Sequence, residues 1–527
     1  MIVAELVLEY LQRDGAPVFG LPGVHNLAFW RTARPAPLVV RHEQAAVYAA
    51  DGLARSTGGL AGAVVTTGPG AANAVAAFGE AAAAGSPVLL VASEIPQALR
   101  RPGRVRGVLH ESRDQAGLFR PLAKAVFTPR TADEVGAALD AAVAAATTPP
   151  RGPVYLDVPA DVLGEAAVRA PARAEEPDPL PTGAALDAAA AVLAGQRVVM
   201  WVGAAAVGDA DAVAALATHL GAPAVSSYGG RGCPPTDHPL AVGVPPHEPE
   251  VAALIGGADV LLAVGGDLDG MNTRNWTMPR PALLVTADPA APPPREWPAD
   301  AAVVGSLGTA LAGLRERLPA HEPWAPTGLR AAVLDRLRAD PATAEAVALV
   351  EAVQAARTPD TVLVCDMAVA GYWVGGYASA PAARRLAYPV GWGTLGFGLP
   401  AAIGPAAAGL PVIAVCGDGG LAMALGELAT LVQERLPVTV LVVDDAGYGM
   451  LRFDQDRAGS PRAGTNLVTP DFLALAAAFG LAATGVERIA DLPGALSAAV
   501  RSGVPHLVRV PAALTPPRTT SPRWHDD

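Results

Sequence analysis

The sequence predicts an α/β fold with three doubly wound parallel-sheet domains. The chain has 527 residues, too many for one compact hydrophobic core. Short apolar runs, typical of strands buried in parallel sheets, alternate with longer helical patterns along its length. Two proline-rich stretches, 171–183 and 318–328, then divide the chain into three parts. We therefore expect domains at residues 1–170, 184–317 and 329–515.

Each expected strand is a short run of apolar residues, rich in valine, between turn signals. In chain order, the clearest runs are 63–67, 88–91, 154–158, 198–202, 260–264, 282–286, 361–365, 412–416, 438–443 and 506–510. Helical patterns separate most of these runs, which favours parallel sheets joined by right-handed crossovers.

The composition narrows the classes of partner. The net charge is −12 and no basic block is present, so nucleic acid is not expected to bind. No strongly apolar run reaches 18 residues, and residues 1–16 read as an amphipathic helix instead of a signal peptide. The three cysteines, Cys233, Cys365 and Cys416, are scattered and suggest neither a disulfide framework nor a zinc site. We expect a cytoplasmic protein.

Two carboxylates follow neighbouring strands of the third expected sheet. Asp418 comes shortly after the run 412–416, and Asp445 shortly after the run 438–443. A right-handed crossover places the carboxyl ends of such strands side by side, so both side chains can hold one hard cation. Mg²⁺ prefers one or two carboxylates together with phosphate oxygens. The sequence therefore predicts a magnesium site that also binds a diphosphate.

The segment between these two strands predicts a helix whose start approaches an anion. Gly417, Gly419 and Gly420 surround Asp418 and allow the backbone to come close to a phosphate. Pro437 is expected to end the helix. Its apolar face is expected to consist of Leu421, Leu425, Leu428 and Val432.

This pattern resembles the metal–diphosphate motif of thiamine-diphosphate enzymes, in which Gly-Asp-Gly is followed after a fixed spacing by two asparagines. The alternative is a glycine-rich turn and an acidic turn in an ordinary α/β protein. The spacing aligns Asp445 with the second asparagine, and an aspartate there adds a negative charge near the diphosphate. By the same resemblance, Gly447 is the third metal ligand. The further cofactor contacts it implies are Tyr448, Gly449 and Met450.

Three patches in the first part of the chain are similar to pyrimidine-binding motifs of the acetolactate synthase and 2-oxo-acid decarboxylase superfamily. They are the turn 19–23, the helix start 41–46 and the strand-to-helix turn 66–73. With the third part, the resemblance covers essentially the whole chain. The cofactor contacts it implies in these patches include Pro22, Gly70 and Asn73.

The resemblance assigns the central catalytic role to Glu43. In the family, a buried glutamate at this place hydrogen-bonds a ring nitrogen of the cofactor's aminopyrimidine. A carboxyl suits this task because it can share a proton with a ring nitrogen. Without the resemblance, Glu43 would be an acid favoured near a helix N-terminus by the helix dipole.

The stretch 391–396 matches the dinucleotide-binding pattern Gly-x-Gly-x-x-Gly, but no strand leads into it, so we reject that interpretation. The longer string from Gly391 to Gly404 resembles the cofactor loop of the thiamine-diphosphate enzymes. There Gly393 would contact the cofactor and Leu395 would lie under its bent form, between the two rings. The alternative is that Leu395 is an ordinary core leucine.

Three residues are candidates for proton transfer during the reaction. His110 and Glu111 lie in a turn before residues 114–124, where related decarboxylases carry histidines. His25 follows the turn 20–23. Imidazole and carboxylate groups can relay protons to a reaction intermediate. For each histidine, a structural role is an equally open interpretation.

The reaction implied by the resemblance is decarboxylation of a 2-oxo acid, with or without ligation to a second carbonyl. The C-terminal run resembles acetolactate synthase most, but Phe453 and Asp454 stand where that family carries a tryptophan. A non-oxidative decarboxylase of the benzoylformate or pyruvate type is the first alternative, ahead of an oxidase or a catalytically silent paralogue. FAD is neither supported nor excluded. The family's order of domains implies a homodimer or homotetramer with active sites between chains.

Overall fold

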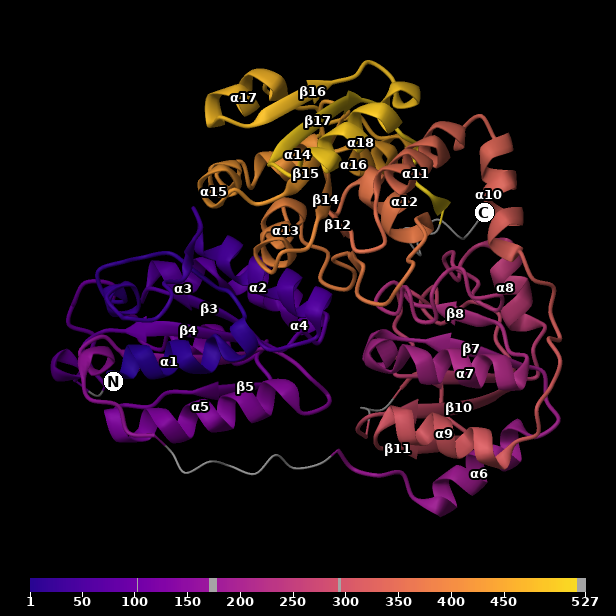
Figure 1. The fold of residues 1–527 in the computed structure, drawn as a ribbon, viewed down its shortest axis with the longest axis horizontal. Helices are drawn as coiled ribbons and strands as arrows, with labels where there is room; N and C mark the ends of the chain where they lie inside the picture. Colours follow the sequence, from indigo (N-terminus) through magenta and orange to yellow (C-terminus); the bar gives the residue numbers. More distant parts are fainter. Residues whose placement is uncertain (102, 170–177, 292–294, 519–527) are drawn as a thin grey trace.

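The computed structural model describes residues 1–527 apart from 102, 170–177, 292–294 and 519–527. Three parallel sheets form three α/β domains, so the predicted fold class is confirmed. Figure 1 shows the N-terminal domain and the middle domain side by side, with the C-terminal domain above them. The predicted linker 318–328 contains no helix or strand, whereas most of the other, 171–177, lies outside the described residues.

The N-terminal domain has a six-stranded parallel sheet of order β2-β1-β3-β4-β6-β5. Its strands are β1 Val18–Gly20, β2 Leu38–Val39, β3 Ala61–Val65, β4 Val88–Glu94, β5 Ala125–Phe127 and β6 Val154–Pro159. Its helices are α1 Val3–Leu11, α2 Glu43–Thr57, α3 Pro69–Asn73, α4 Val75–Ala83 and α5 Ala132–Thr147. The predicted strand 63–67 thus lies two residues too late in the chain, because Thr66 and Thr67 already belong to the turn into α3.

The middle domain has a five-stranded parallel sheet of order β11-β10-β9-β7-β8. Its strands are β7 Val198–Val202, β8 Ala224–Ser226, β9 Val260–Val264, β10 Leu283–Asp288 and β11 Ala301–Val304. Its helices are α6 Gly183–Leu193, α7 Ala210–Leu220, α8 Pro249–Gly256 and α9 Leu307–Arg317.

The C-terminal domain repeats the arrangement with a six-stranded sheet of order β13-β12-β14-β15-β17-β16. Its strands are β12 Val362–Cys365, β13 Leu386–Ala387, β14 Val412–Gly417, β15 Val438–Asp444, β16 Ala482–Gly485 and β17 His506–Pro511. Its helices are α10 Leu329–Ala339, α11 Ala344–Ala356, α12 Val369–Tyr377, α13 Gly398–Ala407, α14 Asp418–Ala422, α15 Glu427–Glu434, α16 Gly449–Arg457, α17 Phe472–Phe479 and α18 Leu492–Ser502.

The prediction of a single helix after Asp418 is wrong, because the chain forms two short helices there, α14 and α15. The break allows α15 to meet the N-terminal domain, where the buried Glu427 accepts the backbone N–H of Arg41 at 3.0 Å. Helix α15 ends at Glu434, ahead of Pro437, with Arg435 in the left-handed conformation.

Helix α2 of the N-terminal domain packs against α13 of the C-terminal domain (Figure 1). Two glycines permit the close approach: a Cβ on Gly52 would lie 2.0 Å from the carbonyl oxygen of Ala401, and one on Gly404 would lie 2.0 Å from that of Ala49. Arg55, whose side chain is 14% exposed, pairs with the buried Asp51 and donates to the carbonyl of Tyr388 across the interface. This contact fixes the two domains relative to each other. In the part of the chain that the structure describes, no helix is both long and apolar enough to cross a membrane.

Candidate active site

The structure brings Asp418, Asp445 and Gly447 together at the carboxyl ends of two neighbouring strands. Strands β14 and β15 pair in register, with Gly417 opposite Val443, so the residues that follow them lie side by side. Asp418 is 1% exposed, and its Oδ2 accepts the backbone N–H of Gly447 at 2.8 Å. Burial and the neighbouring Asp445 carboxylate raise the pKa of Asp418 to about 6.

The donor set at this place suits a hard divalent cation. The Asp445 carboxylate is close enough to raise the pKa of Asp418. The carbonyl oxygen of Gly447 lies 3.5 Å from the position that a Cβ on Gly419 would take. Mg²⁺ prefers such oxygen ligands, and it would favour the ionised form of both acids. Among the described residues, no group of three or more His, Cys, Asp or Glu side chains could hold a metal, so the third protein ligand would be a backbone oxygen.

Arg452 offsets the extra negative charge that Asp445 brings to the site. Its Nη2 lies 2.8 Å from Asp445 Oδ1 and donates to the Asp445 carbonyl oxygen at 2.8 Å. Both side chains are 14% exposed, so water screens the pair only weakly. The sequence reasoning missed this arginine, although it lies in the first turns of the helix that follows Asp445.

The glycine-rich turn around Asp418 leaves no room for side chains. A Cβ on Gly419 would lie 2.7 Å from the ring of Tyr448, and one on Gly420 would lie 2.6 Å from Asp366 Oδ2. Since both approaches are closer than van der Waals contact, only glycine is tolerated here, as a backbone that binds an anion closely requires.

A cavity opens beside this turn, and much of the predicted cofactor-binding set lines it. The predicted residues in its wall are Leu395, Gly417, Asp418, Gly420, Asp445, Tyr448, Gly449 and Met450. Met367 and Tyr372 also line it, whereas Gly393, Gly419 and Gly447 do not. Leu395 is 37% exposed, so it is not a core leucine. All the described lining residues belong to the C-terminal domain.

Asp366 anchors the loop that carries Leu395. The residue is fully buried, and its Oδ1 accepts the backbone N–H groups of Met367, Gly396 and Phe397 at 2.8, 3.0 and 3.3 Å. Burial raises its pKa to about 6, although these N–H groups favour its charged form. Asp366 was not among the site residues predicted from the sequence. It directly follows the expected strand 361–365, much as Asp418 comes shortly after the expected strand 412–416.

Glu43, Gly70 and Asn73 meet at the start of α2. Glu43 is 8% exposed, and its Oε2 accepts a hydrogen bond from Asn73 Nδ2 at 3.0 Å. Its Oε1 lies 3.2 Å from the position that a Cβ on Gly70 would take. The Asn73 amide therefore fixes one carboxylate oxygen, and the small Gly70 lies beside the other.

Pro22 lies in an exposed turn that the buried Asn26 stabilises. Asn26 Oδ1 accepts the backbone N–H of Gly23 at 2.6 Å, and its amide donates to the Leu21 carbonyl at 3.1 Å. A Cβ on Gly23 would lie 2.7 Å from Thr66, so this turn approaches the β3–α3 turn closely. The sequence reasoning did not single out Asn26.

His25 and His110 face each other, with ring centroids 5.3 Å apart and planes at 60°. The Nδ1 atoms of both rings are buried and have no hydrogen-bond partner among the described residues. Burial, followed by the neighbouring His110, lowers the pKa of His25. The carboxylate of Glu111 instead accepts the backbone N–H groups of Arg106 and Val108. The structure thus pairs the two histidines and directs Glu111 into its own loop.

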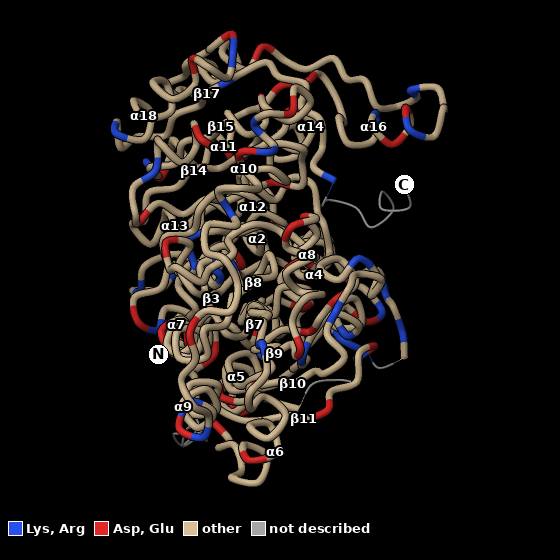
Figure 2. The backbone as a smooth tube through the Cα atoms, turned by 90° about the vertical axis from the view of Figure 1, so that its right-hand side faces the viewer, with Lys and Arg blue, Asp and Glu red and all other residues tan. Residues whose placement is uncertain are grey.

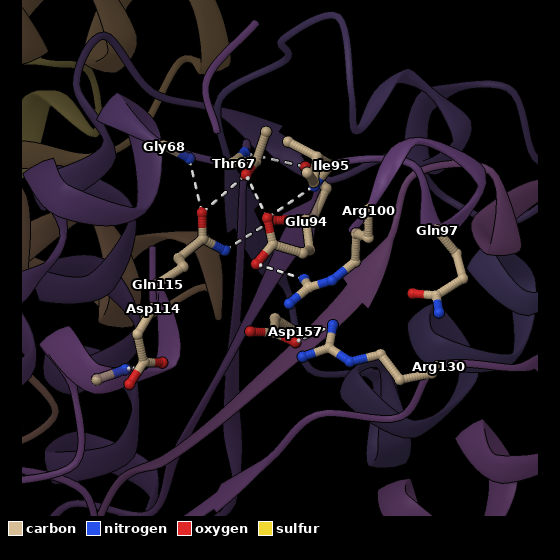
Figure 3. A network of polar contacts seen from close by, with 12 residues as sticks. Thr67, Gly68, Glu94, Ile95, Gln97, Arg100, Asp114, Gln115, Arg130 and Asp157 are labelled. Atoms are coloured by element: carbon tan, nitrogen blue, oxygen red, sulfur yellow. Dashed lines mark hydrogen bonds and ion pairs between the residues drawn. The ribbon is translucent and has the colours of Figure 1, made fainter. Parts of the chain in front are cut away.

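A buried glutamine lies behind the β3–α3 turn (Figure 3). Gln115 is 1% exposed, and its Oε1 accepts from Gly68 N at 2.7 Å and from Thr67 Oγ1 at 2.8 Å. Its Nε2 donates to the Ser93 carbonyl and to the Tyr155 hydroxyl, both at 2.9 Å. All its hydrogen-bonding capacity therefore ties the turn to β4 and β6.

Two buried acids continue this network toward the carboxyl ends of β4 and β6. Glu94 pairs with Arg100 at 3.1 Å, and Asp157 pairs with Arg130 at 3.2 Å (Figure 3). Burial raises the pKa of Asp157 to about 7, against the opposing effect of Arg130. The Glu94 charge favours protonation of His25. Sequence reasoning missed both acids: Glu94 lies three positions beyond the expected strand 88–91, and Asp157 lies inside the expected strand 154–158.

Family models place the chain among known proteins. A model described as "Thiamine pyrophosphate enzyme, N-terminal TPP binding domain" matches residues 1–118, the corresponding central domain matches residues 186–314, and the C-terminal TPP binding domain matches residues 366–510. The matches follow the order of the three sheets and cover the residues around both Glu43 and Asp418. The chain belongs to the thiamine pyrophosphate enzyme family. This confirms the resemblance found in the sequence.

Relatives within the family differ in the reaction that their names give. The chain is 32% identical to the probable 2-ketoarginine decarboxylase of Pseudomonas aeruginosa, over 92% of this chain and 90% of that protein. It is 29% identical to a probable acetolactate synthase large subunit of Methanocaldococcus jannaschii, over 96% of this chain and 91% of that protein. It also resembles the X-ray structure of a protein from Mycobacterium smegmatis described as a candidate thiamin diphosphate-dependent enzyme. That match has a TM-score of 0.81 and 25% identity and covers 97% and 99% of the two chains.

Proposed function

We propose that the protein is a thiamine-diphosphate- and Mg²⁺-dependent enzyme that decarboxylates 2-oxo acids and joins the product to a second carbonyl, as acetolactate synthases do. The observation that carries the proposal is the pairing of Asp418 and Asp445 beside the glycine-rich turn at the ends of β14 and β15. Here Asp418, Asp445 and the carbonyl of Gly447 would hold the metal, which would in turn bind the diphosphate.

When bound, the cofactor supplies a carbanion that adds to the keto carbon of the substrate and accepts electrons from the breaking bond. Leu395, on the loop fixed by Asp366, would support the bent cofactor from below. Glu43, held by Asn73, would share a proton with the pyrimidine ring nitrogen. The role of this chain is thus to orient the cofactor and to keep one proton at a defined atom.

The two histidines support a second candidate, simple non-oxidative decarboxylation. An imidazole pair with unpartnered nitrogens can donate a proton to the carbon that loses CO₂, which releases an aldehyde. The similarity to a probable 2-ketoarginine decarboxylase also favours this candidate. Ligation and protonation use the same first steps, so the two candidates differ only in what the decarboxylated carbon bonds next.

We further propose that the working unit is a homodimer, or a homotetramer built from dimers, with active sites between chains. The cavity beside Asp418 is lined by the C-terminal domain, and the described wall contains no residue of the N-terminal domain that carries Glu43. A second copy that brings its own Glu43 to this cavity would complete the site.

A complementation experiment tests this arrangement. Glu43→Gln and Asp418→Asn variants are each expected to be inactive, whereas mixed dimers contain one site in which both residues are wild type. Co-expressed, differently tagged chains should therefore recover about a quarter to a half of the wild-type activity, because each active site works independently of the others. Failure of co-purified mixed dimers to recover activity would argue for sites within one chain.

The reaction itself is tested with purified protein, thiamine diphosphate, Mg²⁺ and a panel of 2-oxo acids, followed by identification of the products. Acetolactate or another acyloin supports ligation, whereas aldehyde alone supports the decarboxylase. Hydrogen peroxide or an acyl phosphate would identify an oxidase instead. Cofactor binding without turnover of any 2-oxo acid would identify a catalytically silent protein.

A further inference from the structure

Tyr372 lines the cavity beside the candidate metal site, and its hydroxyl has no protein partner. The residue is 7% exposed, and its ring packs against that of Tyr388 with centroids 6.4 Å apart. The hydroxyl makes no hydrogen bond to any residue that the structure describes. Burying a hydroxyl without a partner is unfavourable, so this group indicates a ligand in the cavity that accepts its hydrogen bond.

The other polar side chains of α12 already have partners. Trp373 Nε1 donates to the carbonyl oxygen of Thr515 at 2.8 Å, and the hydroxyl of Tyr377 donates to Glu248. The helix contains no Lys, Arg, Asp or Glu. Figure 2 shows α12 within the body of the molecule and α16, whose start also lines the cavity, projecting at its edge. Tyr372 is therefore the polar side chain that α12 offers to a ligand.

The first turn of α12 presents backbone donors to the same cavity. Its N-cap residue, Ala368, has no side chain that could accept a hydrogen bond. Among the described residues, nothing accepts the N–H groups of Val369, Ala370 and Gly371, although all three residues are buried. Uncapped donors at a helix start need an acceptor, and the helix dipole favours a negative one.

This helix start lies next to the candidate metal site. A Cβ on Gly449, at the start of α16, would lie 3.7 Å from Val369 Cγ2 and would also contact Asp445 Oδ2. Tyr372 is the fourth residue of α12, and a helical side chain covers the turn that precedes its own Cα. An anion at the start of α12 is therefore close to both the Tyr372 hydroxyl and a metal ion on Asp445.

We propose that the Tyr372 hydroxyl donates a hydrogen bond to an oxygen of the cofactor's diphosphate. This inference rests on the cofactor assignment in the proposed function and adds a binding residue to it. The described wall of the cavity contains no lysine or arginine, so the metal, backbone N–H groups and hydroxyls must balance the diphosphate charge. Burial above all raises the pKa of Tyr372 to about 12, which keeps the hydroxyl protonated as a donor at neutral pH.

Tyr372→Phe tests the proposal because it removes the hydroxyl and keeps the ring. Fluorescence titration with thiamine diphosphate at saturating Mg²⁺ should show binding weakened by about tenfold, as expected for a hydrogen bond to a charged group. Calorimetric titration with inorganic pyrophosphate and Mg²⁺ should show a similar loss, because this probe consists of the diphosphate alone. Neither measurement requires turnover.

Tyr388→Phe is the matched control. Tyr388 packs against Tyr372 outside the described wall of the cavity, and its hydroxyl donates to Met367 Sδ at 3.8 Å. Its affinities for thiamine diphosphate and pyrophosphate should remain near the wild-type values. Equal losses in the two variants would overturn the proposal, because the effect would then not arise from the hydroxyl in the cavity.

Thermal unfolding separates cofactor binding from a structural role. Since the hydroxyl has no protein partner, Tyr372→Phe should keep or raise the thermal midpoint of the protein without cofactor. It should reduce the rise in midpoint that thiamine diphosphate and Mg²⁺ cause. A lower midpoint without cofactor, together with an unchanged rise, would show that the hydroxyl supports the fold and would overturn the proposal.

The remaining outcomes separate this inference from the proposed function. Unchanged affinities in Tyr372→Phe, or a loss for thiamine diphosphate without a loss for pyrophosphate, would overturn the inference alone. Weakened binding of both ligands, in a protein whose wild type turns over no 2-oxo acid, would support the inference and overturn the proposed reaction. Wild-type protein that binds neither ligand would overturn both.

Discussion

Arg452 Nη2 lies 2.8 Å from Asp445 Oδ1, so an ion pair forms at the proposed metal-ligand position where the chain departs from the family's usual residue. The family resemblance expects a neutral asparagine in place of Asp445. The arginine restores the local charge balance, so the substitution does not by itself repel the diphosphate.

The ion pair predicts a coupled effect on cofactor affinity. Arg452→Gln should weaken thiamine diphosphate binding about tenfold, because the charge of Asp445 then faces the diphosphate alone. In an Asp445→Asn background the same change should have little effect. A double-mutant cycle, with affinities measured by fluorescence titration at fixed Mg²⁺, gives the coupling energy, expected at about 1 kcal/mol or more. Purely additive losses would contradict the pairing.

The same pair predicts how Asp445→Asn alone behaves. Asparagine keeps an oxygen for the metal and removes one charge, so Mg²⁺ binding without cofactor should weaken while diphosphate binding is retained. Titration of Mg²⁺ with and without cofactor measures the difference. An Asp445→Ala variant, which removes the oxygen as well, should lose both, and equal behaviour of the two variants would exclude a ligand role for this side chain.

Glu43→Gln should fold and bind the cofactor but lose about 10²- to 10⁴-fold in kcat, because the amide cannot share a proton with the pyrimidine ring. Steady-state kinetics, together with the thermal midpoint and cofactor affinity, check this. The exposed Glu165→Gln is a suitable control for the loss of one negative charge. Turnover near the wild-type value in Glu43→Gln would remove Glu43 from the mechanism.

Gln115 should affect catalysis through the turn it holds. This turn contacts His110, since a Cβ on Gly68 would lie 2.6 Å from the His110 carbonyl oxygen, and it leads into the helix with Asn73. Gln115→Leu leaves the Gly68 N–H unpaired, so kcat should fall about tenfold, with about 1–3 kcal/mol lost in stability. Tyr155→Phe removes only the hydroxyl contact and should change kcat less than about threefold. Similar kinetics for both variants would contradict a positioning role.

Asp157 should make stability depend on pH. Its folded pKa of about 7 lies above the ordinary value of 3.8, so the folded state holds a proton that the unfolded state has lost. The free energy of unfolding contributed by this group therefore falls as pH rises from about 4 to about 7. Asp157→Asn should raise the thermal midpoint relative to wild type more at about pH 8 than at about pH 5.

Asp187→Asn, at a side chain that is 70% exposed, is the control and should show no such trend. The guanidinium of Arg130 is 28% exposed and can be hydrated when its partner is neutral, so the substitution leaves no fully buried charge. A midpoint difference that is the same at both pH values would show that Asp157 does not hold the proton.

Local sequence determined a large part of this molecule. Apolar runs separated by helical patterns predicted three parallel sheets, because buried parallel strands must be apolar on both faces. Asp418 and Asp445 were predictable as neighbours, because each comes just after a run that forms one of two adjacent parallel strands. The helix between them was harder to place: its apolar period continued through residues 423–426, where the structure has a break between α14 and α15.

Only the tertiary structure decided the supports of the candidate site. Gln115 accepts from Gly68, Asp366 accepts from Gly396, and Asn73 donates to Glu43, yet each pair is separated by at least 30 positions in the chain. Periodicity and turn signals report on near neighbours, whereas such contacts depend on how elements pack. The sequence therefore identified many of the residues that can carry the chemistry, and the packing of strand ends and turns determined which groups hold them in place.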